Sequence, residues 1–292
     1  MHIVFHIGVH HTDEGLLLKA LRSNTDILAS AGILVPKKED YRSILGDTLQ
    51  KLRGEAASEE LQDAVLDTIL DDAEGDRVFF TNENFSCMHA AVFAQGRLYE
   101  RLAKRSAWLR NIFPDFTVSI AMSLRDPATL VPDVYRSLKD APAFPEWMNG
   151  LNLGALSWLQ VVRELREALP DTPLILWCNE DTPLIWPEVV QAVTGHAADL
   201  MLEDQDILLA QIMSDAGLKR LRSYLADHPP RSVEKRRRVI TAFLDKFAKP
   251  DAMEEEIDLE GWSAEIMDAL SQQYETEVDE IALMPGVQFI LP

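Results

Sequence analysis

The first 21 residues contain the feature that most restricts how this chain can fold. An apolar run over residues 2–7 ends at Gly8, a polar loop continues to Gly15, and a leucine-rich helical pattern starts at Leu16. A strand, a short loop and a helix in this order gather backbone amides around one point, as at the start of phosphate-binding α/β folds. The stretch therefore predicts an α/β fold with an anion cradle between residues 8 and 15.

The rest of the chain alternates apolar runs with helical patterns. Four near-continuous apolar runs predict strands over residues 2–7, 77–81, 117–124 and 174–178, and shorter extended pieces occupy 33–36 and 288–291. Helical periodicity predicts helices over residues 16–30, 41–53, 58–72, 96–112, 127–139, 155–169, 185–194, 204–227, 232–248 and 262–280. Strands of this kind are buried on both faces, so we expect a three-layer α/β fold, a parallel sheet with helices on both faces.

The length and composition fit one soluble domain. A chain of 292 residues, 47% of them hydrophobic, buries roughly three quarters of its unfolded surface. We expect a single domain over residues 1–292, with an α/β core over 1–200 and a mainly helical C-terminal part over 201–292 packed on it. The acidic run 251–260 is expected to be a surface loop.

Charge and cysteine content restrict the partners and the compartment. The formal net charge is −20 at pH 7, which argues against nucleic acid and anionic membranes as partners. Cys87 and Cys178 are too few and too far apart for a disulfide framework, so we expect free thiols in a reducing compartment. No apolar run reaches about 18 residues, and no signal-peptide pattern opens the chain. A cytoplasmic location is the expectation.

Polar residues follow every long predicted strand. These are residues 8–15, 82–84, 125–127 and 179–181. In open α/β sheets the ligand lies beyond the carboxyl ends of the strands, so the site is expected at this edge. The loop does not fit a nucleoside triphosphate, because Asp13 and Glu14 stand where a Walker loop has glycine and lysine.

Two short segments resemble the sulfotransferase superfamily in its bacterial form. They are His6-Ile7-Gly8-Val9-His10-His11-Thr12, at the first loop, and Leu124-Arg125-Asp126-Pro127, after the strand at 117–124. The chain is also similar to that family at three shorter places, namely Gly32-Ile33, Pro36 and the C-terminal residues 286–292. The resemblance implies a P-loop-like sheet and 3′-phosphoadenosine 5′-phosphosulfate as the cofactor.

The resemblance also implies roles for individual residues. His11 falls at the position of the family's lysine, and Glu83 at that of a base for the acceptor. Arg125 would hold the 3′-phosphate of the cofactor, and Ser137 would assist if its helix is shifted. The remaining cofactor contacts would come from Gly8, Val9, His10 and Thr12.

Three acidic residues depart from the family pattern. Asp13 and Glu14 replace a glycine and a threonine, and Asp133 stands where the family has a serine. Carboxylates near phosphate oppose binding, unless Asp13 and Glu14 serve only as acidic residues at a helix start. We therefore favour a catalytically silent binding or interaction protein. The alternative is an active sulfotransferase moving a sulfuryl group to a hydroxyl or amine of a small-molecule, glycan or protein acceptor.

Other residues have two interpretations each. Glu83 is either a general base or part of a turn capped by Asn82 or Asn84. The N-terminal histidines match no zinc spacing, so no metal site is predicted. The basic cluster over residues 231–238 is either a solvated face that balances nearby acids or an anion or partner site. Trp147 is a candidate for the wall of an acceptor pocket.

Overall fold

One parallel sheet organises the molecule. A computed structural model describes residues 1–71, 73–250 and 257–292, and these residues form a six-stranded sheet with the order β2-β3-β1-β4-β5-β6. Every neighbouring pair of strands is parallel. The strands are β1 (His2–His6), β2 (Ile33–Leu34), β3 (Arg77–Thr81), β4 (Thr117–Leu124), β5 (Leu174–Cys178) and β6 (Val287–Ile290). The predicted α/β fold with a parallel sheet is therefore confirmed.

Side chains of β1 alternate between two hydrophobic layers. Ile3 and Phe5 point into the larger core, Val4 points into the smaller one, and all three are fully buried. Successive side chains of a strand face opposite sides of the sheet, so a strand covered on both sides must be apolar at nearly every position. This explains why the long strands appear in the sequence as continuous apolar runs.

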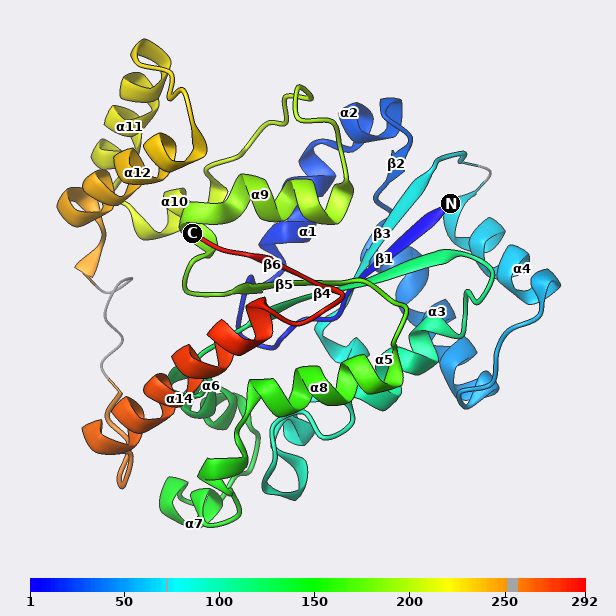
Figure 1. Cartoon of the computed structure of the whole chain (residues 1–292), viewed down its shortest axis with the longest axis horizontal. Helices are drawn as coiled ribbons and strands as arrows, with labels where there is room; N and C mark the ends of the chain where they lie inside the picture. Colours follow the sequence, from blue (N-terminus) through cyan, green and yellow to red (C-terminus); the bar gives the residue numbers. More distant parts are fainter. Residues whose placement is uncertain (72, 251–256) are drawn as a thin grey trace.

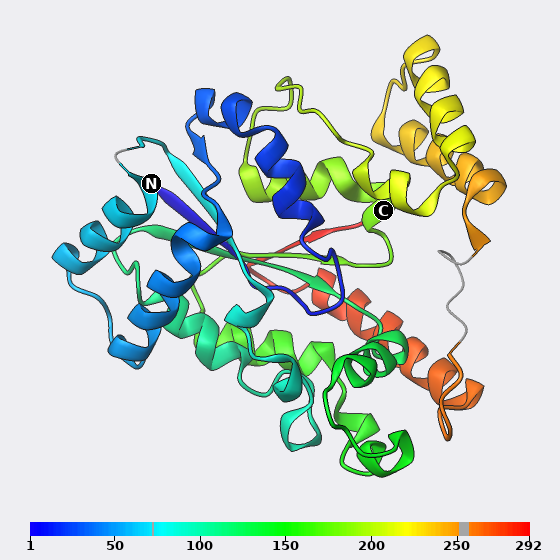
Figure 2. The ribbon, with the colours of Figure 1, turned by 180° about the vertical axis from the view of Figure 1, so that it is seen from behind.

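Helices cover both faces of the sheet (Figures 1 and 2). The smaller core lies under α1 (Leu16–Ser23), α2 (Thr25–Ser30) and α9 (Thr182–Thr194). The larger core lies under α3 (Lys38–Leu52), α4 (Glu59–Leu70), α5 (Leu102–Arg110), α6 (Pro127–Ser137), α7 (Phe144–Met148), α8 (Trp158–Ala168) and α14 (Ala264–Ala282).

Three further helices form a small lobe beside α9 (Figure 1). They are α10 (Ile207–Ile212), α11 (Asp215–Asp227) and α12 (Val233–Phe247), and they share a third core that includes Leu221 and Leu244. The chain then crosses to the other face as α14 and returns to the sheet as β6. The helices of the described ranges include none long and apolar enough to cross a membrane.

Several predicted helices differ from the observed ones. The helix predicted over 16–30 divides at Asn24, the helix over 96–112 begins only at Leu102, and the helix over 204–227 divides after Ile212. The expected loop around Pro145 contains α7. The last predicted residue of the helix 58–72 and most of the expected acidic loop, residues 251–256, lie outside the described residues.

β1 and β4 are neighbours in the sheet, but the connections that follow them run over opposite faces of the sheet. β1 leads to β2 through α1 and α2 on the smaller-core face, whereas β4 leads to β5 through α6, α7 and α8 on the other face. Such a switch point leaves a crevice beyond the carboxyl ends of the two strands, where open α/β sheets bind ligands. The loop over residues 8–15 and Arg125 both start at this point.

Candidate functional site

The loop over residues 8–15 leaves β1 through a glycine that no other residue replaces easily. The φ angle of Gly8 is +104°, and a Cβ added there would lie 3.2 Å from the Cα of Glu83. Glycine adopts this conformation at no steric cost, whereas other residues are strained. His11, Glu14 and Gly15 also have positive φ angles, so the loop is tightly curled. Gly8 therefore brings the loop against the turn that follows β3.

Asp13 caps the start of α1 with its own carboxylate. Its Oδ2 accepts a hydrogen bond of 2.9 Å from the amide of Leu17, and its carbonyl accepts one of 2.8 Å from the amide of Leu16. The first amides of a helix lack partners within the helix and attract anions. A carboxylate of the chain itself therefore occupies part of the position that a bound anion would take.

Thr12 and Glu14 have no comparable contact with the helix start. The hydroxyl of Thr12 donates to the carbonyl of Val9 at 2.8 Å, which closes the loop on itself. The Glu14 side chain is exposed and makes no hydrogen bond within the described part of the chain. The expectation of an acidic residue serving the helix start is thus met by Asp13.

Arg125 follows β4 directly and is bound by the protein on several sides. Its Nη2 lies 2.6 Å from Asp133 Oδ2, its Nη1 donates to the carbonyl of His11, and its Nε donates to Thr129 Oγ1 at 3.2 Å. The side chains of Arg125 and Asp133 are only 12% and 18% exposed. The guanidinium thus joins the loop over residues 8–15 to α6 through a largely buried ion pair.

Three histidines pack together beside the loop. The His10 and His89 ring centroids are 4.4 Å apart, and those of His11 and His89 are 4.8 Å apart. His11 Nε2 lies 2.9 Å from His89 Nε2 and 3.3 Å from Ser137 Oγ. The hydroxyl of Tyr99 accepts from the amide of His10 at 3.0 Å and lies 2.9 Å from its Nδ1.

Burial keeps these rings neutral. Burial, followed by the neighbouring His89, lowers the pKa of His10 to about 4. The same two causes lower the pKa of His11, and the opposing effects of Asp133 and Glu14 do not outweigh them. His11 is therefore uncharged at pH 7 and does not reproduce the permanent charge of a lysine at its position.

Glu83 is held as a carboxylate by a lysine. Its Oε2 lies 2.9 Å from Lys38 Nζ, and its Oε1 accepts from Asn84 Nδ2 at 3.3 Å. Burial alone would raise the pKa of Glu83, but hydrogen bonds from Lys38 and from the backbone, together with the charge of Lys38, outweigh it, and the pKa lies below its usual value. A base with a lowered pKa accepts protons poorly. Asn82 caps the turn by accepting from the amide of Asn84 at 3.1 Å.

The sequence did not predict a place in this site for Lys38, His89 or Tyr99, nor the contact of Asn84 with His10. Lys38 could have been suspected, because it follows the extended piece 33–36 at the carboxyl edge of the sheet. Tyr99 could not, since it lies inside a predicted helix.

No protein-family model, no curated protein and no solved structure matches this chain. The resemblance to sulfotransferases therefore rests on the loop over residues 6–12, on Leu124-Arg125-Asp126-Pro127 and on the shorter matches named with them. Within the described ranges, no group of three or more histidine, cysteine, aspartate or glutamate side chains is arranged to hold a metal ion. Both cysteines are free and buried, and burial raises the pKa of Cys87 to about 11.

Two cavities adjoin the histidines. One of 280 Å³ is lined by His89, Phe93, Val134 and Trp147, so Trp147 does line a pocket beside the site. The other, of 630 Å³, lies on the far side of Asn84 between α3 and α5. Both are close to the carboxyl edge of the sheet, where the sequence led us to expect a ligand.

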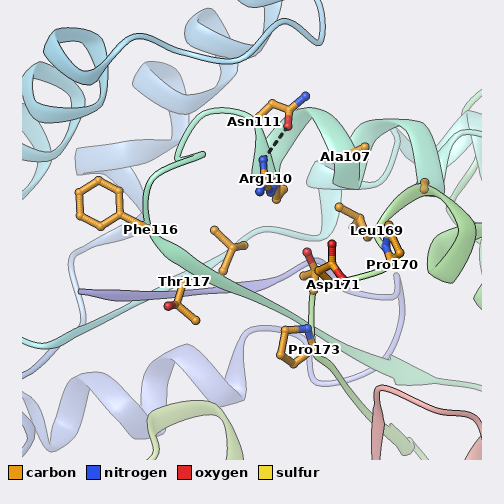
Figure 3. Close-up of a pocket in the computed structure, with 12 residues that line it drawn as sticks. Ala107, Arg110, Asn111, Phe116, Thr117, Leu169, Pro170, Asp171 and Pro173 are labelled. Atoms are coloured by element: carbon orange, nitrogen blue, oxygen red, sulfur yellow. Dashed lines mark hydrogen bonds between the residues drawn. The ribbon is translucent and has the colours of Figure 1, made fainter.

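A cavity of 430 Å³ lies at the opposite edge (Figure 3). Thr117, the first residue of β4, and Pro173, just before β5, line it together with Arg110. The Nη1 of Arg110 donates to Asn111 Oδ1 at 3.4 Å, as the dashed line shows. This cavity is remote from the loop over residues 8–15 and does not belong to the candidate site.

The basic cluster is partly structural. Arg236 Nη2 donates to both oxygens of Glu188, at 2.7 and 2.8 Å, and to the carbonyl of Leu184 at 3.2 Å. Arg237 lies 3.8 Å from the same carboxylate. These contacts fasten α12 to α9 and favour the interpretation of a face that balances nearby acids.

Proposed function

We propose that the protein is a catalytically silent binding protein, a pseudoenzyme on a sulfotransferase-like, P-loop-type scaffold whose cofactor cradle is closed by its own side chains. The observation that carries the proposal is the ion pair of Arg125 with Asp133 at 2.6 Å. By the resemblance, Arg125 would hold the 3′-phosphate of 3′-phosphoadenosine 5′-phosphosulfate. In this chain its guanidinium is neutralised by an aspartate and hydrogen-bonded to the His11 carbonyl.

The electrostatic cost of cofactor binding supports this conclusion. A carboxylate about 4 Å from a phosphate charge costs roughly 4 kcal/mol at an effective dielectric constant near 20. Micromolar binding supplies only about 8 kcal/mol in total. Asp133 at the 3′ side and Asp13 at the start of α1 would both oppose the cofactor, and together they remove the affinity that a working transferase needs.

The groups expected to perform transfer are also poorly suited to it. His11 is neutral at pH 7 because burial lowers its pKa, and Glu83 is a weak base because Lys38 lowers its pKa. The fold retains the features of a binding scaffold, namely a curled loop at the switch point and two cavities beside it. Binding without group transfer therefore accounts for the site better than catalysis.

Thermal unfolding with 3′-phosphoadenosine 5′-phosphate tests the proposal. A ligand present at 100 times its dissociation constant stabilises a protein by about 2.7 kcal/mol. We expect no stabilisation at millimolar ligand and low salt, at pH 6 or pH 8. A clear stabilisation that Arg125→Ala abolishes would overturn the proposal in favour of an active transferase.

A further inference from the structure

The cavity beyond Asn84 has the size of a small-molecule site. Its volume is 630 Å³, within the range of roughly 300–1,000 Å³ found for ligand pockets. Its walls come from α3, from α5 and from the segment that follows Glu83. Asn84 lines the cavity and also contacts Glu83 and His10, at 3.3 and 3.5 Å. The cavity therefore adjoins the histidines but is separate from the loop over residues 8–15.

Cations gather in this cavity although the chain as a whole is strongly acidic. Arg101, Lys104 and Arg105 line it, against a single acid, Glu100, whose Oε2 lies 3.5 Å from Arg101 Nε. Within the described part of the chain, neither Lys104 nor Arg105 forms an ion pair with a carboxylate. In a protein of net charge −20, a cavity lined by two cations that have no carboxylate partner among the described residues is suited to an anionic ligand.

Each cation contacts a neighbour, although Lys104 is exposed. Arg105 Nε donates to the carbonyl of Phe85 at 2.8 Å, which orients the guanidinium. Lys104 Nζ lies 5.1 Å from the ring centroid of Trp108, a cation–π distance. Both residues lie on α5 and line the cavity.

An apolar wall completes the cavity. Trp108 packs so closely on Gly54 that a Cβ at that glycine would lie 2.3 Å from the indole Nε1, and the ring is therefore held in place. Ala91 and Met88 also line the cavity, and Met88 is 65% exposed. A fixed indole beside two cations suits a ligand that has a flat apolar body and a negative group.

We propose that this cavity binds a small organic anion with a planar apolar body, such as an aromatic sulfonate, sulfate ester or carboxylate. Lys104 and Arg105 receive the anionic group, and Trp108 contacts the ring. The inference deepens the proposed function, on which it rests for the role of a binding protein, by naming the class of ligand.

Isothermal titration with 2-naphthalenesulfonate at low salt tests the proposal, with 2-naphthol as the uncharged probe. We expect saturable binding of the sulfonate, and affinity at least tenfold lower for 2-naphthol. The double variant Lys104→Gln/Arg105→Gln should weaken sulfonate binding at least tenfold. The matched control Lys235→Gln/Arg238→Gln, which removes the same charge from the exposed face of α12, should change it less than twofold.

A second variant distinguishes a lost contact from misfolding. Lys104→Met keeps the aliphatic stem beside Trp108 and removes only the charge, so it should fold normally and still weaken binding. Equal affinity for sulfonate and naphthol would overturn the proposal, as would an equal loss in the α12 control.

The outcomes separate this inference from the proposed function. Arg125 does not line the cavity, so sulfonate binding and 3′-phosphoadenosine 5′-phosphate binding are measured at different places. If 3′-phosphoadenosine 5′-phosphate binds through Arg125, the proposed function fails and the cavity result stands. If the sulfonate does not bind, the cavity proposal fails, and the proposal of a closed cofactor site is unaffected.

Discussion

Replacing Asp133 by asparagine removes one charge from the pair with Arg125 and nearly keeps its shape. The two charged groups lie 2.6 Å apart, which corresponds to an attraction of about 6 kcal/mol at an effective dielectric constant of 20. Desolvation cancels much of that attraction in the intact pair. Removing one partner of a buried pair nevertheless costs about 3–5 kcal/mol, because the other charge is left uncompensated.

The exposure of the pair places Asp133→Asn at the lower end of that range. The two side chains are 12% and 18% exposed, so water reaches the site to a small extent. The second contact of Asp133, with Arg136 at 3.2 Å, involves a side chain that is 38% exposed and adds little. We therefore expect the free energy of unfolding to fall by about 3 kcal/mol.

Urea unfolding followed by circular dichroism measures this loss, with Glu280→Gln as the matched control. Glu280 pairs with Arg163 at 3.1 Å, but both side chains are more than half exposed, so its loss should cost less than about 1 kcal/mol. Equal effects of the two variants would refute the reasoning, since a weak pair would leave Arg125 available to a phosphate.

Two further predictions concern the loop. Asp13→Ala should lower the free energy of unfolding by about 1 kcal/mol, because it removes a charged acceptor from the start of α1. Glu14→Ala should have little effect. Equal effects of the two variants in thermal unfolding would contradict the capping role of Asp13. Burial lowers the pKa of His10 to about 4, so the unfolded chain binds a proton that the folded chain does not, and stability should fall by up to about 3 kcal/mol as pH drops from 6.5 to 4. His10→Asn should reduce that pH dependence in urea unfolding, and an unchanged slope would show that His10 does not cause it.

The strands could be predicted from the sequence because burial on both faces leaves a local signal. The predicted ranges 77–81, 117–124 and 174–178 coincide with β3, β4 and β5. Each of these strands is apolar at most positions and ends in polar residues. The location of the candidate site followed from the same pattern, since parallel strands bring their carboxyl ends to one edge.

Two of the helix breaks, at Asn24 and before Leu102, accompany contacts with distant residues that the sequence could not predict. Asn24 Oδ1 accepts from the amide of Glu203 at 2.7 Å, and its Nδ2 donates to the carbonyl of Ala20 at 2.8 Å. The side chain thus links the end of α1 to a segment far along the chain. Tyr99 has a φ angle of 47° and delivers its hydroxyl to His10. The local hydrophobic periodicity cannot indicate Glu203 as the partner of Asn24 or His10 as the partner of Tyr99.

The acidic residues could be recognised in the sequence, but their contacts could not. The resemblance to sulfotransferases implied that Asp13 and Asp133 stand at positions where a carboxylate would oppose phosphate. It did not show that Asp13 bonds the amide of Leu17 or that Asp133 pairs with Arg125, because both contacts depend on how the loop and α6 are placed. The structure shows that each carboxylate has a partner within the chain.

Calorimetric titration of 3′-phosphoadenosine 5′-phosphate into the wild-type protein and into Asp13→Asn/Asp133→Asn tests the central claim most directly. If the chain's own carboxylates keep the cofactor out, the wild type shows no binding at millimolar ligand, and the double variant, which has lost both carboxylate charges, binds measurably. Tight binding to the wild type, or no binding to a folded double variant, would contradict the claim.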